Sequence, residues 1–307
     1  MELYPATIVF STNLEKNSIK HGSLLPIVAL VITMVFRRWK YLVLAGLMSF
    51  GLSVGTQTPS QALSWRDLFR GGIQVLQGVQ LSRMSDRQEV EIGQQINQNL
   101  LATEFKLYND PLIQNYVNQI GQRLVPNSNR STLPYTFQVV ESDQINAFAT
   151  MGGFVYVTTG LMKTASNEAE LAGVIGHEIG HIEGKHLIKQ ISRTAWQQGL
   201  LTATGVDRSQ VVQLGLELAV RRPHSRDDER DADGRGLRIM GASGYAQSAV
   251  VSFMRKLESG NNPPQFLSTH PSPGSRVQNL ENAIDPAKRN GDGLDELAYR
   301  SQIQSLR

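Results

Sequence analysis

Apolar residues in this chain recur at helical spacing. Ile92, Ile96 and Leu100 stand four residues apart within residues 85–101, so they share one face of a predicted helix. Residues 110–125 have the same amphipathic pattern. This part of the chain is therefore predicted to supply two helices to a core.

Two short segments have the pattern of strands. Residues 135–140 alternate between polar and apolar, and in residues 152–157 β-branched and aromatic residues follow a glycine pair, as in a hairpin strand. Residues 209–222 predict another helix. It is too short to cross a bilayer, and it is interrupted by Gln210, Gln213 and Glu217.

A further helix is predicted to begin at Asn167, which forms a capping-box-like pair with Glu170. Its core-facing stripe consists of Leu171, Ile175, Ile179 and Ile182. Glycines in a helix cost ~0.5–1 kcal/mol each, and this one contains Gly173, Gly176 and Gly180. They predict that another element packs tightly against the helix.

The opposite side of this helix carries candidate chemistry. His177 and His181 are four residues apart, so both imidazoles can reach one metal ion. Glu178 lies close enough to act as general base on a metal-bound water, which is the chemistry of zinc hydrolases. Because the pattern fixes only three positions, the alternative is two hydrogen-bonded histidines on a polar helix face.

A third ligand is available in residues 225–233. Ser225 and Asp228 form a second capping-box signature, and Glu229 and Asp233 then share one helix face. Glu229 can complete a His-His-Glu zinc site, and Asp233 can fix the tautomer of a ligand histidine. The alternative, a solvated charged face, is the better interpretation for the other acids, Asp227, Asp228 and Asp231.

Composition limits the other functions. The chain has 307 residues and no cysteine, which excludes disulfides, thiolate zinc ligands and a cysteine nucleophile. Residues 1–62 carry five basic and two acidic side chains, so the remainder carries 25 of each. A chain with no net charge outside its first segment has no basic field for nucleic acid.

The amino terminus has the order of a secretory signal. A basic cluster at residues 37–40 precedes an apolar run at 41–52 and a small-residue site at 60–62. We expect a signal peptide over residues 34–62, starting at Met34. The location is then periplasmic or otherwise extracytoplasmic, and the alternative is an uncleaved anchor that holds the protein to the membrane, facing the periplasm.

The remaining boundaries follow from these assignments. Residues 1–33 are interpreted as an upstream extension, and residues 63–81 as a Gly/Gln-rich linker. The metallopeptidase domain is expected over residues 82–285. Residues 286–307 are expected to form a polar tail.

Several motifs together resemble a known family. His177 to His181 is followed by Glu229 and Asp233 inside Ser-Arg-x-x-Glu-x-x-Ala-Asp. Residues 145–149 lead into residues 152–157, and Ser268-Thr269-His270-Pro271 precedes Arg276. This combination resembles the gluzincin zinc metallopeptidases that include the CaaX-prenyl endopeptidase, HtpX, the Oma protease and BepA, and it is most similar to BepA-type periplasmic members without helical repeats.

The resemblance implies an α+β fold, a mostly helical protease domain with a small β-hairpin or sheet beside the active-site helix. It implies one Zn²⁺ held by His177, His181 and Glu229, with Glu178 as base and a strand at 152–157 along which substrate can pair. Expected substrates are misfolded or unassembled envelope proteins. The alternative function is a chaperone-like zinc protein whose masked site is rarely active.

Other residues remain candidates. His224 and Arg226 flank the predicted third-ligand helix and could polarise the scissile carbonyl, and Asn146 and Gly153 are possible substrate contacts. Arg276 is expected to pair with a carboxylate, and His186 is expected to have a structural role. The resemblance implies that His270 is a regulatory fourth zinc ligand, whereas the alternative is a histidine that only holds its proline-restricted loop.

Overall fold

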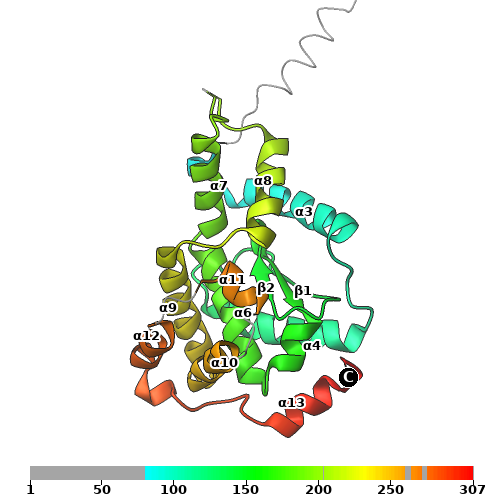
Figure 1. The fold of residues 1–307 in the computed structure, drawn as a ribbon, viewed down its shortest axis with the longest axis vertical. Coiled ribbons are helices and arrows are strands. Elements are labelled where there is room, and N and C mark those ends of the chain that lie inside the picture. Colours follow the sequence, from blue (N-terminus) through cyan, green and yellow to red (C-terminus); the bar gives the residue numbers. More distant parts are fainter. Residues whose placement is uncertain (1–79, 203, 260–263, 272–274, 307) are drawn as a thin grey trace, which may run out of the picture. The chain divides into compact units, whose positions relative to one another are not determined.

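The computed structural model describes residues 80–202, 204–259, 264–271 and 275–306 (Figure 1). The chain divides into two units, Met1–Leu63 and Ser64–Arg307, and the first lies wholly outside the described residues. The structure therefore does not describe the upstream extension, the signal peptide or anchor, or residues 63–79 of the expected linker. None of the helices in the described ranges is long and apolar enough to cross a membrane.

Helices dominate the described part, and their labels follow Figure 1. They are α3 (Asp86–Thr103), α4 (Pro111–Leu124), α5 (Thr159–Thr164), α6 (Glu168–Glu183), α7 (His186–Gln197), α8 (Arg208–Arg221), α9 (Arg226–Ala242), α10 (Ser248–Glu258), α11 (Gln265–Thr269), α12 (Arg276–Ala283) and α13 (Glu296–Gln302). Short 3-10 turns occupy Leu81–Arg83, Val125–Asn127, Met151–Gly153, Pro286–Lys288 and Gln304–Leu306.

One small sheet accompanies these helices, in the order β1-β3-β2. Strand β1 (Thr136–Val140) is parallel to β3 (Phe154–Thr158), and β2 (Ala147–Ala149) is antiparallel to it. The expected α+β class is confirmed. The expectation that residues 152–157 offer a strand for substrate is wrong, because β3 is central and both of its edges are already paired.

Helix starts follow the local sequence. Ser85 and Gln88 cap α3 reciprocally, and Asp110 caps α4 ahead of Pro111. Such caps satisfy amide groups that have no partner inside the helix. The predicted stripe on α3, Ile92, Ile96 and Leu100, is buried. It packs in a hydrophobic cluster with apolar residues of α7 and α8.

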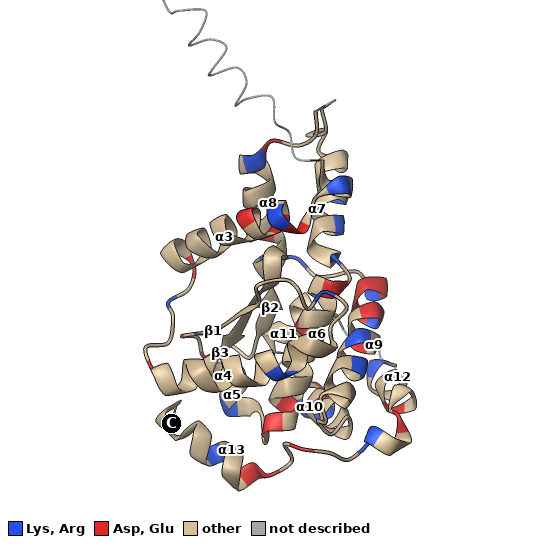
Figure 2. Cartoon of the chain, turned by 180° about the vertical axis from the view of Figure 1, so that it is seen from behind, with Lys and Arg blue, Asp and Glu red and all other residues tan. Residues whose placement is uncertain are grey.

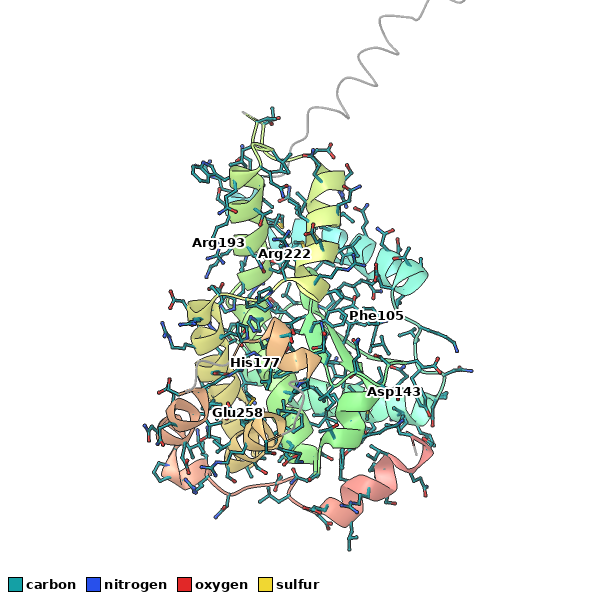
Figure 3. The ribbon with its side chains drawn as sticks, in the orientation of Figure 1. Phe105, Asp143, His177, Arg193, Arg222 and Glu258 are labelled. Atoms are coloured by element: carbon teal, nitrogen blue, oxygen red, sulfur yellow. The ribbon has the colours of Figure 1, made fainter. Side chains whose placement is uncertain are left out.

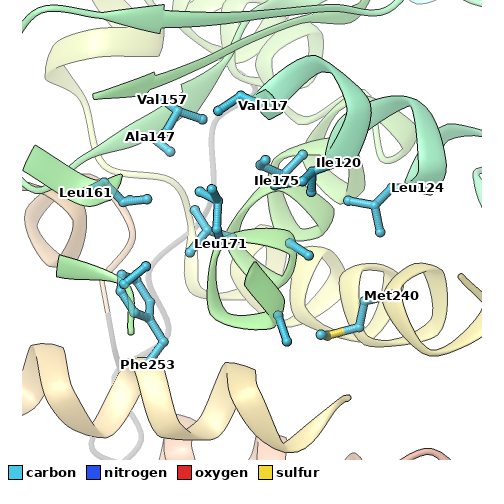
Figure 4. Close-up of a cluster of buried hydrophobic side chains, with 14 of the residues drawn as sticks. Val117, Ile120, Leu124, Ala147, Val157, Leu161, Leu171, Ile175, Met240 and Phe253 are labelled. Atoms are coloured by element: carbon cyan, nitrogen blue, oxygen red, sulfur yellow. The ribbon is translucent and has the colours of Figure 1, made fainter. Parts of the chain in front are cut away.

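Helix α6 runs through the centre of the domain, and its stripe belongs to the main hydrophobic cluster (Figure 4). The glycines do face tightly packed neighbours, as predicted. A Cβ on Gly180 would lie 2.7 Å from the carbonyl oxygen of Ala232, and one on Gly236 would lie 2.9 Å from the amide nitrogen of His177. Missing side chains therefore let the backbones of α6 and α9 touch.

The carboxyl-terminal segment packs against the domain. Residues 286–307, expected as a polar tail, contain Tyr299, Ile303 and Leu306, which belong to the main cluster. The Tyr299 hydroxyl donates a hydrogen bond to the carbonyl of Met162 at 2.7 Å. Burial of these three side chains attaches the segment to the core, although most of its residues are polar.

Candidate metal centre

Four side chains from three parts of the chain meet in the interior of the domain. His177 and His181 come from α6, Glu229 comes from α9, and His270 directly follows α11. Each has a candidate ligand atom, and these atoms all lie within 4.8 Å of one another. All four side chains are buried. Figure 3 shows His177 beside α11, between α9 and the sheet.

The spacing of these atoms fits a small tetrahedral ion. His177 Nε2 lies 3.0 Å from His181 Nε2 and 3.3 Å from His270 Nδ1. Glu229 Oε1 lies 3.3 Å from His181 Nε2 and 3.1 Å from His270 Nδ1. Donors 2.0–2.1 Å from a central zinc would be separated by about 3.3 Å in a tetrahedron. The residues present therefore fit Zn²⁺.

Buried atoms without partners support the same interpretation. Among the described residues, neither carboxylate oxygen of Glu178 forms a hydrogen bond, and the nearest charged partner of Oε1 is His270 Nε2 at 3.5 Å. Burial raises the pKa of Glu178. Leaving such groups unpaired in the interior is costly. A cation with a water beside it would satisfy them.

His177 is supported by a carboxylate and an arginine. Its Nδ1 lies 3.0 Å from Asp233 Oδ1, and Arg276 donates to both oxygens of Asp233 at 2.9 and 2.7 Å. Arg276 also lies 3.0 Å from Glu229, so it pairs with carboxylates as expected. Burial alone would lower the pKa of His177, but Asp233 and Glu229 raise it to about 9. The same negative groups would favour a bound cation.

The other predicted contacts divide into two groups. The ring of His224 stacks on His181 at 4.1 Å, and Asn146 is buried with its side-chain oxygen 3.5 Å from Thr269 Oγ1. His224 therefore lies beside the cluster, and Asn146 lies beside the residue that precedes His270. Arg226 is exposed at the start of α9 and is not brought to it. Gly153 has a φ of +97° and packs against Tyr135, which explains its glycine by backbone geometry.

His270 is held from several sides. Its ring stacks on Phe266 at 4.5 Å, and its backbone carbonyl accepts a hydrogen bond from Arg276 at 3.2 Å. The carbonyl of the preceding Thr269 accepts from the amide of His224. Pro273, a second proline that follows His270 in the sequence, lies outside the described residues. These contacts fix the histidine over the other three donors.

The acidic face of α9 was only partly understood from sequence (Figure 2). Asp227 is exposed and pairs with Arg230, as expected of a solvated residue. Asp231, however, lies 3.0 Å from His186 Nε2, and His186 Nδ1 lies 2.9 Å from His181 Nδ1. Sequence reasoning missed this pair, because His186 would point away from His181 on an unbroken helix.

A cavity of about 360 Å³ adjoins the donor cluster and is lined in part by Glu229, Asp233 and Arg276. A second cavity, of about 10 Å³, is lined in part by His181, His224 and Ala149, which is room for about one water. The four donors are nonetheless buried in this arrangement.

Comparison with known proteins agrees with this geometry. The chain is 33% identical over 225 residues to the beta-barrel assembly-enhancing protease of Yersinia pestis, covering 67% of this chain and 46% of that protein. It is 33% identical over 218 residues to the protein of the same name from Escherichia coli, covering 66% and 45%.

A more distant relative is the mitochondrial metalloendopeptidase OMA1 of Arabidopsis thaliana, 30% identical over 185 residues, covering 59% of this chain and 38% of that one. The chain thus spans less than half the length of these relatives. The model of peptidase family M48 matches residues 111–284, a segment that contains the whole donor cluster. The chain belongs to peptidase family M48.

Proposed function

We propose that this protein is a zinc-dependent endopeptidase with one Zn²⁺ held by His177, His181 and Glu229. The observation that carries the proposal is the spacing of the buried donors, which matches a tetrahedral zinc site. Glu178 lies on the same helix as the two histidines, and neither of its carboxylate oxygens forms a hydrogen bond among the described residues. It is the proposed general base.

The proposed chemistry assigns each group one task. When bound, zinc would lower the pKa of a coordinated water and polarise the scissile carbonyl. Glu178 would take the proton of the attacking water and pass it to the leaving amine. Asp233 and Arg276 would hold His177 in the tautomer that presents Nε2 to the ion.

We also propose that substrate pairs with the outer edge of β2. The amide of Thr158 bonds to the carbonyl of Asn146, and the amide of Thr150 bonds to the carbonyl of Phe154. The main-chain hydrogen-bonding groups of residues 146 and 150 therefore face β3. Because these groups alternate in an antiparallel pair, those of Ala147 and Ala149 point away from β3, toward the outer edge of β2. An extended, unfolded segment could add there as a further strand.

The proposed substrates are misfolded or unassembled proteins of the cell envelope. Main-chain pairing selects extended chain rather than a particular sequence, which suits unfolded proteins. The likeness to beta-barrel assembly-enhancing proteases supports this substrate class. The proposed location is extracytoplasmic, with membrane association through the amino-terminal segment as the alternative to cleavage, and it rests on the signal-like order of residues 34–62.

A second candidate function is favoured by the fourth donor. His270 completes a set of four donors, and a zinc with four protein ligands has the coordination of a structural site. The protein could then act as a chaperone-like binding protein that cleaves only after His270 withdraws. Both functions use His177, His181 and Glu229. They differ in whether His270 also binds the zinc, and therefore in the activity of the resting protein.

The test compares wild type with Glu178→Gln, each prepared as the full chain and analysed for zinc. We expect equal zinc and folding in both, with cleavage of casein or of an unfolded outer-membrane protein reduced ~10²–10⁴-fold in the variant. The amide cannot accept the proton of the attacking water. Equal turnover by the two proteins would remove Glu178 as base, and full zinc in His181→Ala and Glu229→Ala would remove the site.

A further inference from the structure

The two histidines of α6 are supported differently at the nitrogens that face away from the donor cluster. His177 Nδ1 meets the carboxylate of Asp233 directly at 3.0 Å. His181 Nδ1 instead meets a second histidine, His186 Nδ1, at 2.9 Å. His186 Nε2 in turn lies 3.0 Å from Asp231 Oδ2. His177 is thus connected to a carboxylate of α9 directly, and His181 is connected to another carboxylate of α9 through an imidazole.

The donors and acceptors from His181 through His186 to Asp231 can be arranged in one direction. If His181 binds a metal through Nε2, its proton resides on Nδ1, which must donate. His186 Nδ1 then accepts, so the proton of His186 resides on Nε2 and is donated to Asp231. Every donor in the sequence from His181 to Asp231 meets an acceptor, with no proton left over.

The backbone is shaped to make this contact. Lys185 has a φ of +52°, in the left-handed region, and it separates the end of α6 from the start of α7 at His186. The break turns His186 back onto His181. A Cβ on Gly184 would lie 2.3 Å from His186 Nε2, so only glycine leaves room for the ring in this position.

The surroundings keep the pair in place. His186 is 1% exposed, whereas the side chain of Asp231 is 41% exposed. Arg235 donates to Asp231 at 2.7 Å. Asp228 lies 3.8 Å from His186 Nε2 and is itself paired with Arg193. Both carboxylates near the buried imidazole are thus balanced by arginines, as Asp233 is by Arg276.

We propose that His186 and Asp231 are positioning residues that hold His181 in the tautomer and orientation needed to bind zinc. Partners of this kind orient a metal ligand and make its nitrogen a stronger donor, and their loss typically costs about 10–100-fold in metal affinity. The inference rests on the proposed zinc site. It adds two residues to it that do not touch the ion.

The test measures zinc affinity rather than cleavage. Full-length protein stripped of metal is titrated with zinc against a chromophoric chelator. We expect Asp231→Ala to raise the dissociation constant about 10-fold and His186→Ala about 10–100-fold. His186→Gln, which retains an acceptor and a donor, should restore much of the affinity. The double variant should bind no worse than His186→Ala, because Asp231 acts only through His186.

Asp227→Ala is the matched control, since Asp227 is an exposed acid on the same helix whose ion pair, within the described part of the chain, is with Arg230. It should leave the zinc affinity and the visible spectrum of the cobalt-substituted protein unchanged, while Asp231→Ala alters both. If His186→Ala does not fold, Asp231→Ala and Gly184→Ala test the same contact from either side.

Two outcomes overturn the proposal. Wild-type affinity in Asp231→Ala, with zinc lost as expected in His181→Ala, would show that the pair does not support the ligand. Additive losses of zinc affinity in the double variant would show that His186 and Asp231 act independently and not through one series of hydrogen bonds. Failure of wild type to bind zinc at all would instead contradict the proposed function.

Discussion

At the scale of single residues, His270 is the proposed regulatory side chain. Its Nδ1 faces His177 and Glu229 at 3.3 and 3.1 Å, while its Nε2 lies 3.5 Å from Glu178 Oε1. One imidazole thus adjoins both the proposed ligands and the proposed base. In this position it would fill the coordination place that an attacking water needs.

We therefore expect His270→Ala to raise the basal cleavage of an unfolded substrate without loss of bound zinc, because three ligands and an open position remain. Cleavage assays and zinc analysis beside Ser268→Ala, an exposed residue of the same short helix, check this. The alternative is a histidine that only holds its loop. A variant that is less stable and no more active would favour that alternative.

At the scale of elements, the site depends on how closely α6 approaches α9. His177 and His181 are on one helix, and Glu229 and Asp233 are on the other. The helices meet where Gly176 and Gly180 face Ala232 and Gly236. Any side chain added at this contact would push the ligands of one helix away from those of the other.

Gly236→Ala should therefore destabilise the protein by roughly 1–3 kcal/mol, as overpacking does, and should also weaken zinc binding. Gly234→Ala is the matched control, because a Cβ at Gly234 of the same helix meets nothing within 4 Å. It should be neutral or stabilising by roughly 0.5–1 kcal/mol. Urea unfolding with zinc titration measures both, and equal behaviour of the two variants would contradict the close-contact explanation.

The end of α6 is anchored by a buried carboxylate. Glu183 accepts hydrogen bonds from the Asn129 amide at 2.8 Å, from Arg235 at 2.6 Å and from Arg238 at 2.9 and 2.8 Å. Burial alone would raise the pKa of Glu183, but these donors hold it below the usual 4.5. The ionised form is thus favoured by folding.

The sign of the pH dependence follows. A folded-state pKa below the unfolded value adds stability that is present above pH 4.5 and is lost as the pH falls toward the folded value. Glu183→Gln should therefore be most destabilising near pH 7, and its difference from wild type should shrink below pH 4.5. Urea unfolding of both proteins across this range decides it, and a difference independent of pH would exclude the carboxylate as the cause.

At the scale of the whole molecule, residues 63–307 carry 25 basic and 25 acidic side chains, and the surplus of basic residues belongs to residues 1–62. If residues 34–62 are a signal peptide, the mature protein begins near Leu63. Mass spectrometry of protein isolated from its native envelope should find that terminus. A terminus at or shortly after Met34 would favour the uncleaved anchor, and one before Met34 would contradict the proposed start.

The local spacing of residues predicted much of the candidate site. Residues three or four apart share a helix face whatever surrounds them, so the pairing of His177 with His181 and of Glu229 with Asp233 needs no knowledge of the fold. Capping pairs such as Ser225 with Asp228 are equally local, and they located the start of α9 correctly. The glycines of α6 predicted that another element packs closely against this helix, but they did not identify it as α9.

Contacts between distant segments depended on the packing of the whole domain. His177 and His270 are 93 residues apart in sequence, and their contact exists because α11 lies beside α6, where Phe266 also adjoins His177. The approach of His186 to His181 required a left-handed residue at Lys185, which no side-chain period encodes. Strand β3 is central because β1 pairs with one of its edges and β2 with the other. Side-chain spacing describes one element at a time, whereas these arrangements are set by which elements bury surface against each other.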